Sequence, residues 1–212
     1  MGTQLGLFDA ILDLLYIQPV FLLGIIIIGI LLIVIFKKNS NIPKVKICVV
    51  SLIMYYYVCL LLVNIVGIPS LSEYIRLKRL GESFFNPKVN LIPFSDGFSL
   101  SFILNVFLFI PLGFLCPMIS SKFERIHNTI LTGFGLSMLV EISQLFTLHR
   151  ATDIDDLITN ILGTVIGYLC FRLAMGLGFI KSDSSQQFKE KDFFEYLPVI
   201  IIVVAFVVGF FR

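Results

Sequence analysis

Long apolar runs alternate with short polar connections along the whole chain. Five of these runs reach or approach the roughly 20 residues that an α-helix needs to cross a membrane, and a sixth is interrupted by Pro and Gly. We therefore predict an all-α integral membrane protein with about six transmembrane helices, forming one polytopic domain over residues 1–212. The predicted spans are Pro19–Phe36, Lys46–Gly67, Ser101–Ile119, Asn128–Leu148, Asp156–Met175 and Phe193–Phe211.

Three shorter segments follow different patterns. Leu5–Tyr16 carries apolar residues on one side with two aspartates four apart, which predicts a short interfacial helix. Ser70 or Ser72 could cap a helix that runs to about Leu80 and ends at Gly81. Asn90–Phe94 is apolar but contains Pro93 and is too short to span, so we expect a re-entrant or interfacial loop before the third span.

The composition supports the membrane class and excludes others. The chain is 58% hydrophobic and 14% charged, whereas soluble domains carry roughly a quarter charged residues. A net charge of +2, without basic runs interleaved with aromatics, argues against nucleic acid as a partner. The four cysteines are far apart and show no C-x-x-C spacing, so neither a zinc site nor a disulfide framework is predicted.

The distribution of lysine and arginine predicts the orientation of a multi-pass cell-membrane protein. The connections after the first, third and fifth predicted spans hold ten of these residues, and the opposite side holds six. Because basic residues favour the cytoplasmic side, both termini are expected outside.

Polar residues within the spans gather at one predicted membrane face. Unpaired polar groups are costly in a bilayer, so each needs a partner or a function. The starts of the third and fifth spans, the end of the fourth and the Asn90–Phe94 loop should all meet at this face. The candidate site residues are Asn90, Pro93, Phe94, Asn105, Glu141, Gln144, Arg150, Asp153, Asp156 and Asn160.

The fifth predicted span carries a regular stripe. Asp153, Asp156, Asn160, Gly163 and Gly167 step by 3, 4, 3 and 4 residues, so they project within about 80° of one another. The two aspartates could instead cap the helix, and the glycines could serve packing alone.

Glu141 is harder to explain as structure. It lies about one turn inside an apolar run, where an unpaired carboxylate costs several kcal/mol or takes up a proton. Arg150 is its most plausible charge partner.

Order and spacing of these residues resemble the VanZ-like membrane protein family. The resemblance covers roughly Asn90–Gly167 and implies an association with resistance to teicoplanin and related lipid-bearing glycopeptides, more than to vancomycin. The matching motifs are Asn90-Leu-Ile-Pro93-Phe94, Asn105-x-x-x-Phe109-x-Pro111-Leu-Gly113-Phe-Leu-x-Pro117, Glu141-x-x-Gln144 and Arg150-x-x-Asp153-x-x-Asp156-x-x-x-Asn160-x-x-Gly163-x-x-x-Gly167.

The residues and the resemblance are compatible with two main functions. In the first, a polar pocket at the outer face binds an amphiphilic or anionic cell-wall lipid, or the drug itself. Arg150 would engage an anionic group, and apolar walls near Phe94 and Phe109 would take a chain. The partner would then be a membrane lipid, a lipid-linked cell-wall component or a lipoglycopeptide antibiotic.

In the second, the chain is an intramembrane hydrolase or transferase acting on a lipid-linked or phosphorylated substrate. The candidate catalytic residues are Glu141, Arg150, Asp153 and Asp156, with Glu141 as the base. These carboxylates and Asn160 could ligate Mg²⁺ or Ca²⁺, although no cofactor or required metal is expected. A transporter is a third possibility, but no internal repeat supports it.

Overall fold

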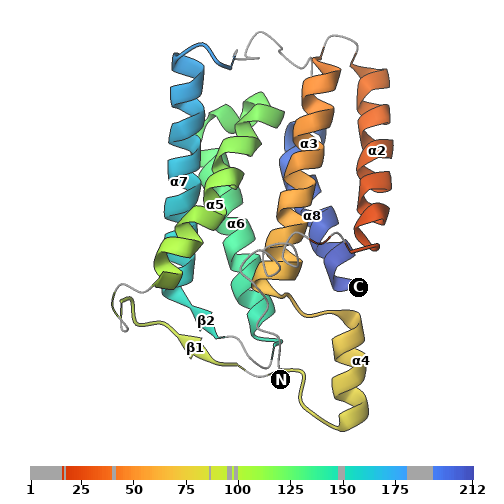
Figure 1. The fold of residues 1–212 in the computed structure, drawn as a ribbon, viewed down its shortest axis with the longest axis vertical. Coiled ribbons are helices and arrows are strands. Elements are labelled where there is room, and N and C mark those ends of the chain that lie inside the picture. Colours follow the sequence, from red (N-terminus) through yellow and green to blue (C-terminus); the bar gives the residue numbers. More distant parts are fainter. Residues whose placement is uncertain are drawn as a thin grey trace, which may run out of the picture.

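A computed structural model describes residues 16, 18–39, 42–85, 87–94, 97, 100–147, 151–180 and 193–212. Nearly all of the regular structure in this part of the chain is helical (Figure 1). The helices are α2 (Phe21–Lys38), α3 (Lys44–Cys59) with its π-helical continuation η1 (Leu60–Val66), α4 (Leu71–Leu80), α5 (Leu100–Ile119), α6 (Ile126–Gln144), α7 (Ile154–Gly176) and α8 (Leu197–Phe210). Two 3₁₀ turns, η2 (Ser121–Glu124) and η3 (Phe193–Tyr196), precede α6 and α8, and two short strands, β1 (Val89–Asn90) and β2 (Thr152–Asp153), precede α5 and α7.

Five helical stretches in the described chain are long and apolar enough to cross a membrane, which confirms the all-α membrane class. They are Phe21–Lys38, Lys44–Leu80, Leu100–Ile119, Ile154–Gly176 and Phe193–Phe210. Helix α6 has 19 residues but is not among these five. It carries Asn128, Ser137, Glu141 and Gln144 on an otherwise apolar sequence. The sixth span, over α6, therefore stays a prediction.

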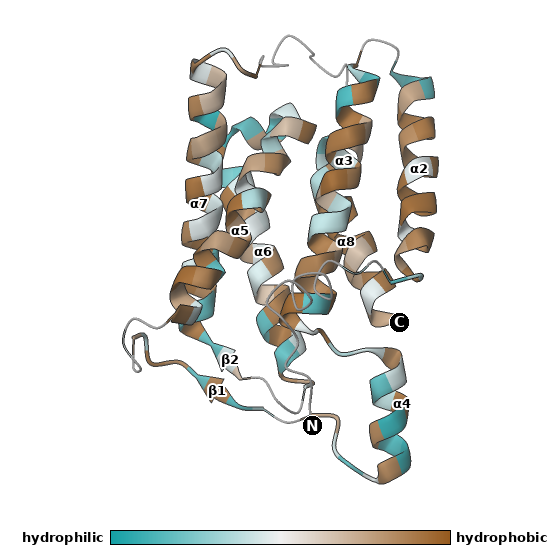
Figure 2. Ribbon diagram, in the orientation of Figure 1, coloured by the Kyte–Doolittle hydropathy of each residue, from teal (hydrophilic) through white to brown (hydrophobic). Residues whose placement is uncertain are grey.

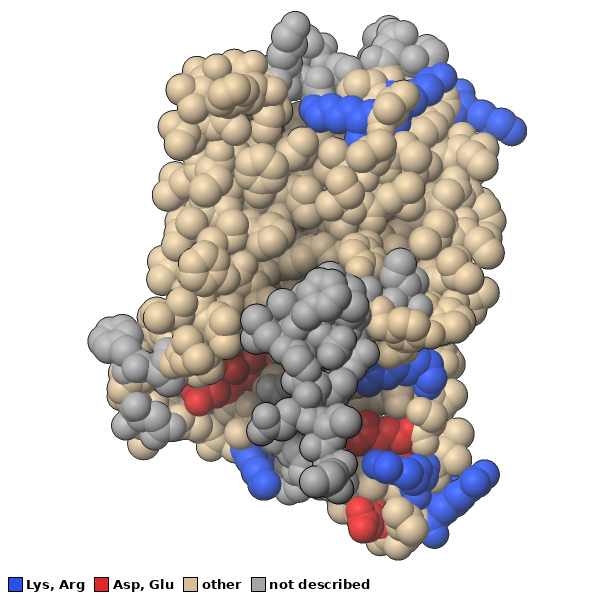
Figure 3. Space-filling model, in the orientation of Figure 1, with Lys and Arg blue, Asp and Glu red and all other residues tan. Residues whose placement is uncertain are grey.

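Charge and hydropathy divide the molecule into zones. Figure 2 shows apolar residues along the length of α2, α3 and α8, whereas α4 is mixed. In Figure 3, charged side chains gather at the two ends of the helix bundle and leave an uncharged band between them on the visible face. Such a band is what a bilayer requires, because charges inside hydrocarbon are costly.

Both ends of the bundle can be named by their connections. We call the end that carries β1 and β2 the strand end, and the other end, which carries η2, the η2 end (Figure 1). Helices α5 and α7 begin at the strand end, and α6 ends there. The arrangement confirms that the predicted polar segments share one end of the molecule.

Close packing of α5 against α7 sets the frame for the site. A Cβ atom added at Gly163 would collide with the backbone carbonyl of Val106, and one at Gly167 with that of Ile110. Small residues of this kind let helix backbones approach within a membrane. The glycine part of the predicted stripe thus faces α5 directly.

The short helix after the second span is also confirmed. Ser70 is the N-cap of α4, and its hydroxyl accepts the backbone N–H of Glu73 at 3.2 Å. Gly81 ends the helix in a left-handed conformation with φ 70°, which glycine adopts without steric cost. Of the predicted interfacial helix Leu5–Tyr16, all but Tyr16 lies outside the described residues.

Candidate functional site

Two strands of two residues each fasten the loop before α5 to the start of α7. β1 and β2 are parallel, with Val89 opposite Thr152 and Asn90 opposite Asp153. The backbone N–H of Thr152 also donates to the carbonyl of Lys88 at 2.8 Å. The pairing places the loop directly over the first turn of α7.

Side chains strengthen this attachment. The amide of Asn90 donates to Asp153 Oδ2 at 3.3 Å, and its Oδ1 accepts the backbone N–H of Ile92 at 3.2 Å. The backbone N–H of Phe94 donates to both carboxylate oxygens of Asp155, at 2.9 and 3.0 Å. These bonds hold the loop across the carboxylates, as the sequence predicted.

The loop lies at the end of the bundle with its apolar side chains exposed, and whether it enters the bilayer stays a prediction. Leu91 and Ile92 are each 69% exposed, Pro93 is exposed, and Phe94 is 45% exposed. Figure 1 shows the strands below the starts of α5 and α7 and beside the end of α6. The two-strand pairing ties the loop to β2 at this end of the bundle.

Glu141 lies at the centre of the site and is 4% exposed. Its Oε2 accepts the backbone N–H of Asp153 at 2.9 Å, and its backbone carbonyl accepts the hydroxyl of Thr152, also at 2.9 Å. When the amide of Gln144 is oriented to suit its neighbours, it donates to Glu141 Oε2 at 3.2 Å and to the carbonyl of Ala151 at 2.9 Å. The end of α6 is thereby joined to the start of α7.

Two amides connect the deeper turns of α7 to the helices beside it. Asn105 on α5 donates to Asp156 Oδ1 at 2.6 Å. Asn160 donates to the hydroxyl of Ser137 on α6 at 3.0 Å. Asp156 and Asn160 both belong to the predicted stripe, so this face of α7 is hydrogen-bonded to α5 and to α6.

Two buried oxygens of this site have no hydrogen-bond partner among the described residues. They are Oε1 of Glu141 and Oδ1 of Asn160, on side chains that are each 4% exposed. Ser137, which accepts the amide N–H of Asn160, lies one helical turn before Glu141 on α6. An unsatisfied buried acceptor costs about 1–3 kcal/mol, so a hydrogen-bond donor is expected there.

The aspartates at the start of α7 cap the helix and also bind residues outside it. Asp153 is the N-cap of α7, and its Oδ1 accepts the backbone N–H of Asp155 at 2.9 Å. Carboxylates at a helix N-terminus are also favoured by the helix dipole. Yet Asp155 and Asp156 extend beyond their own helix, to Phe94 and Asn105 respectively.

Most of the predicted site residues come together in the structure. Hydrogen bonds join Asn90, Phe94, Glu141, Gln144 and Asp153 at the strand end, with Asp155 between Phe94 and Asp153, and two further pairs, Asn105–Asp156 and Asn160–Ser137, join the first turns of α7 to α5 and α6. We call the predicted residues of this set, which are Asn90, Phe94, Asn105, Glu141, Gln144, Asp153, Asp156 and Asn160, the polar cluster. Arg150 lies outside the described residues, so its pairing with Glu141 stays a prediction.

One expected contributor does not belong to the site. Phe109 is 2% exposed and packs in the hydrophobic core, away from the exposed Phe94. Its place on α5 turns it toward Gly163 of α7.

Sequence reasoning missed two members, Asp155 and Ser137. Asp155 binds the loop, and Ser137 binds Asn160. The only signal for Asp155 was its position in Asp153-Ile-Asp155-Asp156, and for Ser137 its place one turn before Glu141. Among the described residues, no group of three or more His, Cys, Asp or Glu side chains is arranged to hold a metal ion.

Fold and site together define a helical membrane protein with an acidic, amide-containing cluster at one end of the bundle. The family model described as VanZ/LLP1 matches residues 52–175, a stretch that runs from α3 to α7 and contains the whole polar cluster. The chain belongs to the VanZ/LLP1 family. No curated protein and no solved structure matches it.

Proposed function

We propose that the polar cluster binds the head group of an amphiphilic cell-envelope molecule and so alters how teicoplanin and related lipid-bearing glycopeptides reach their target. The observation that carries this proposal is the pair of buried acceptors, Glu141 Oε1 and Asn160 Oδ1. Hydroxyl or amino groups of a bound head group would supply the missing donors. Arg150, between α6 and β2 in sequence, would meet an anionic group of the same molecule.

An amphiphile suits this place because apolar side chains surround the polar cluster. Leu91 and Ile92 on the loop are strongly exposed, and so is Leu100 at the start of α5, at 71%. Ile103 and Leu104 continue this exposed apolar surface along α5. A head group could therefore reach the carboxylates while its chain stays in lipid beside α5.

We place the strand end at the outer face of the membrane. This orientation rests on the ten-to-six division of lysine and arginine residues between the two sides. Cell-wall lipids and glycopeptide antibiotics would then meet the polar cluster from outside the cell.

Binding to purified protein in lipid nanodiscs tests the proposal. The probes are fluorescently labelled teicoplanin and a fluorescent lipid-linked cell-wall precursor. In Glu141→Gln, an oxygen can still accept the backbone N–H of Asp153, but an NH₂ group replaces one acceptor. We expect binding of at least one probe to weaken about tenfold, which corresponds to about 1.4 kcal/mol.

Glu82→Gln is the matched control, because Glu82 is an exposed carboxylate outside the polar cluster. It should bind the probe as the wild type does. Equal affinity of wild type and Glu141→Gln for both probes would remove the polar cluster from ligand binding.

Catalysis is the second candidate, and one observation favours it. Glu141 Oε1, which is buried and has no hydrogen-bond partner among the described residues, lies on the side chain that binds the α7 cap residue Asp153, and it could accept a proton from a substrate. Parallel hydrolysis and transport assays with labelled lipids in liposomes separate the two functions. Turnover of a lipid that is lost in Glu141→Gln would favour the enzyme over the binding protein.

A further inference from the structure

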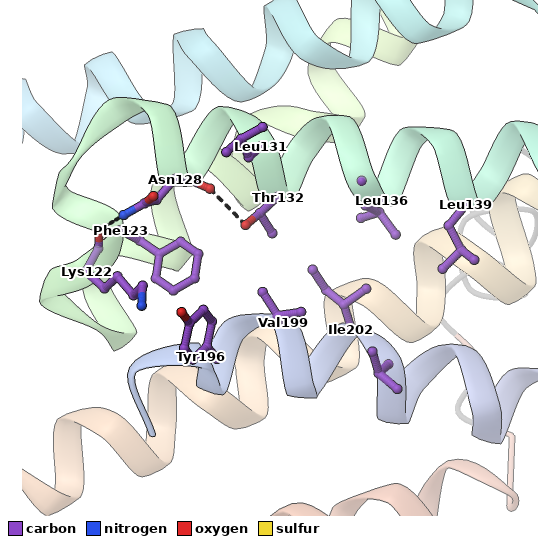
Figure 4. A pocket seen from close by; sticks show the side chains of 12 residues that line it. Lys122, Phe123, Asn128, Leu131, Thr132, Leu136, Leu139, Tyr196, Val199 and Ile202 are labelled. Carbon is purple, nitrogen blue, oxygen red and sulfur yellow. Dashed lines mark hydrogen bonds between the residues drawn. The ribbon is translucent and has the colours of Figure 1, made fainter. Parts of the chain in front are cut away.

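A groove of about 490 Å³ opens between α6 and α8; it begins at the η2 end and reaches along α6 to Leu139 (Figure 4). Its floor is formed by Leu136 and Ile202, which are 2% and 5% exposed. Leu131 and Val203 line its sides and remain 63% and 53% exposed. The volume lies within the range of small-molecule sites, and the exposed sides leave the groove open toward lipid.

The length of the groove corresponds to one leaflet of a bilayer. Its α6 side runs from Asn128 to Leu139, eleven residues apart, which at 1.5 Å per residue spans about 16 Å. Half of a hydrocarbon core of about 30 Å is about 15 Å. At Gly135, midway along, an added Cβ would meet no atom within 4 Å, so space is open there.

One end of the groove is polar and carries the positively charged side chain of Lys122. Lys122 Nζ lies 3.0 Å from Glu195 Oε2 and 3.6 Å from the centre of the Tyr196 ring. Tyr196 and then Glu195 raise the pKa of Lys122 above its ordinary value, so its charge is retained. An ammonium carries three N–H donors, and the Lys122 side chain is 26% exposed, so it can still donate to a ligand.

We propose that this groove binds one acyl chain of a membrane phospholipid, with the lipid phosphate held by Lys122. The fit is one of chemistry and length: an apolar channel as deep as a leaflet leads to a single ammonium at the level of the head groups. Glu195 would face the water-exposed side of the head group. Tyr196 would lie at the glycerol region, where tyrosine is commonly found in membrane proteins. The site is separate from the polar cluster and does not depend on its function.

Native mass spectrometry of the full-length protein, washed and then released from detergent, tests whether the groove binds an acyl chain. We expect the wild type to retain one phosphatidylglycerol molecule. Gly135→Phe should retain at least fivefold less, because its ring fills open space in the groove. Val203→Phe, on the opposite wall, gives the same test if Gly135→Phe does not fold.

Gly29→Phe is the matched control, because Gly29 lies on α2 and also has open space at its Cβ. It should retain lipid like the wild type. Unchanged retention in both groove variants would overturn the proposal. Conversion of a dimer to a monomer by Gly135→Phe, with lipid retention unchanged, would also overturn it and assign the groove to a second copy of the chain.

Competition with a diacylglycerol of the same chains tests the phosphate contact. The wild type should prefer phosphatidylglycerol, and Lys122→Gln should lose that preference. Glu195→Gln breaks the same ion pair but leaves the ammonium, so it should keep the preference. No preference in the wild type, or equal loss in both variants, would show that Lys122 acts only in structure.

Discussion

Single residues at the strand end each link two elements, and Asp155 is the clearest case. Its carboxylate accepts the backbone N–H of Phe94 with both oxygens while its own N–H is bound by the cap residue Asp153. Phe94 has φ 58°, a conformation that a bulky side chain adopts only when its surroundings impose it. The Asp155 carboxylate is therefore expected to hold the loop in place.

Replacing Asp155 with Asn tests this role. Asparagine keeps one acceptor oxygen but loses the charge-assisted bond, which should weaken the attachment of Phe94 by about 1 kcal/mol. Hydrogen exchange at the Phe94 amide should then be about fivefold faster. In Glu82→Gln it should be unchanged, and an unaltered rate in Asp155→Asn would contradict the role.

Residues whose burial in a membrane costs much free energy could be recognised from the sequence, and the others could not. Glu141 was evident because a carboxylate inside an apolar run requires an explanation. Ser137 was not, because a serine in a helix can satisfy its hydroxyl on its own backbone and so gives no such signal. Asp155 and Phe94 are 61 residues apart, and nothing in either segment specifies the other.

Elements meet at the site through the packing of α7 against α5 and α6. Thr164 on α7 is fully buried, and added Cβ atoms at Gly113 on α5 and Gly133 on α6 would collide with its backbone and side chain respectively. This three-helix junction fixes how far apart Asn105, Ser137 and Asn160 can lie. The small-residue pattern predicted the α7 face, but not which helix it would contact.

Gly163→Leu should destabilise the protein by about 3 kcal/mol or more, because the side chain would have to displace the backbone of α5. The measurement is folded yield together with melting temperature in detergent. Gly176→Leu, at the exposed end of the same helix and with open space at its Cβ, should be nearly neutral. Equal melting temperatures for the two variants would contradict the packing.

The β1–β2 pair marks the limit of sequence reasoning at the element scale. Strands of two residues carry no alternation of polar and apolar positions that could be recognised. The apolar Asn90–Phe94 segment therefore resembled a membrane loop as much as an interfacial one. The parallel register with Thr152 and Asp153 holds the loop against the start of α7 at the end of the bundle.

The whole molecule is a bundle whose helix positions were largely predicted from hydropathy. Helices in a bilayer must satisfy their own backbone, so apolar length alone locates them well. α6 is the exception in composition, because its polar residues serve contacts within the protein. Ser137, Glu141 and Gln144 are buried in the half of α6 nearer the strand end, and His127 and Asn128 at its other end lower its hydropathy further.

Orientation is tested by labelling an introduced cysteine with a membrane-impermeant thiol reagent. Lys78→Cys on α4 lies at the strand end, and Lys38→Cys ends α2 at the opposite end of the bundle, each placed in a background in which Cys48 and Cys170, the two native cysteines that are not buried, are replaced by Ser. We expect Lys78→Cys to react in intact cells and Lys38→Cys only after permeabilisation. The reverse pattern would place the polar cluster in the cytoplasm and exclude direct contact with external drug.

Antibiotic susceptibility of a sensitive Gram-positive host expressing the chain tests the central claim most directly. With equal membrane levels confirmed by immunoblot, the wild type and Glu82→Gln should protect against teicoplanin more than against vancomycin. Glu141→Gln and Arg150→Ala should lose that protection, because they alter the acceptor and the cation proposed to bind the head group. Full protection by Glu141→Gln, or none by well-expressed wild type, would contradict the claim that the polar cluster acts on glycopeptides.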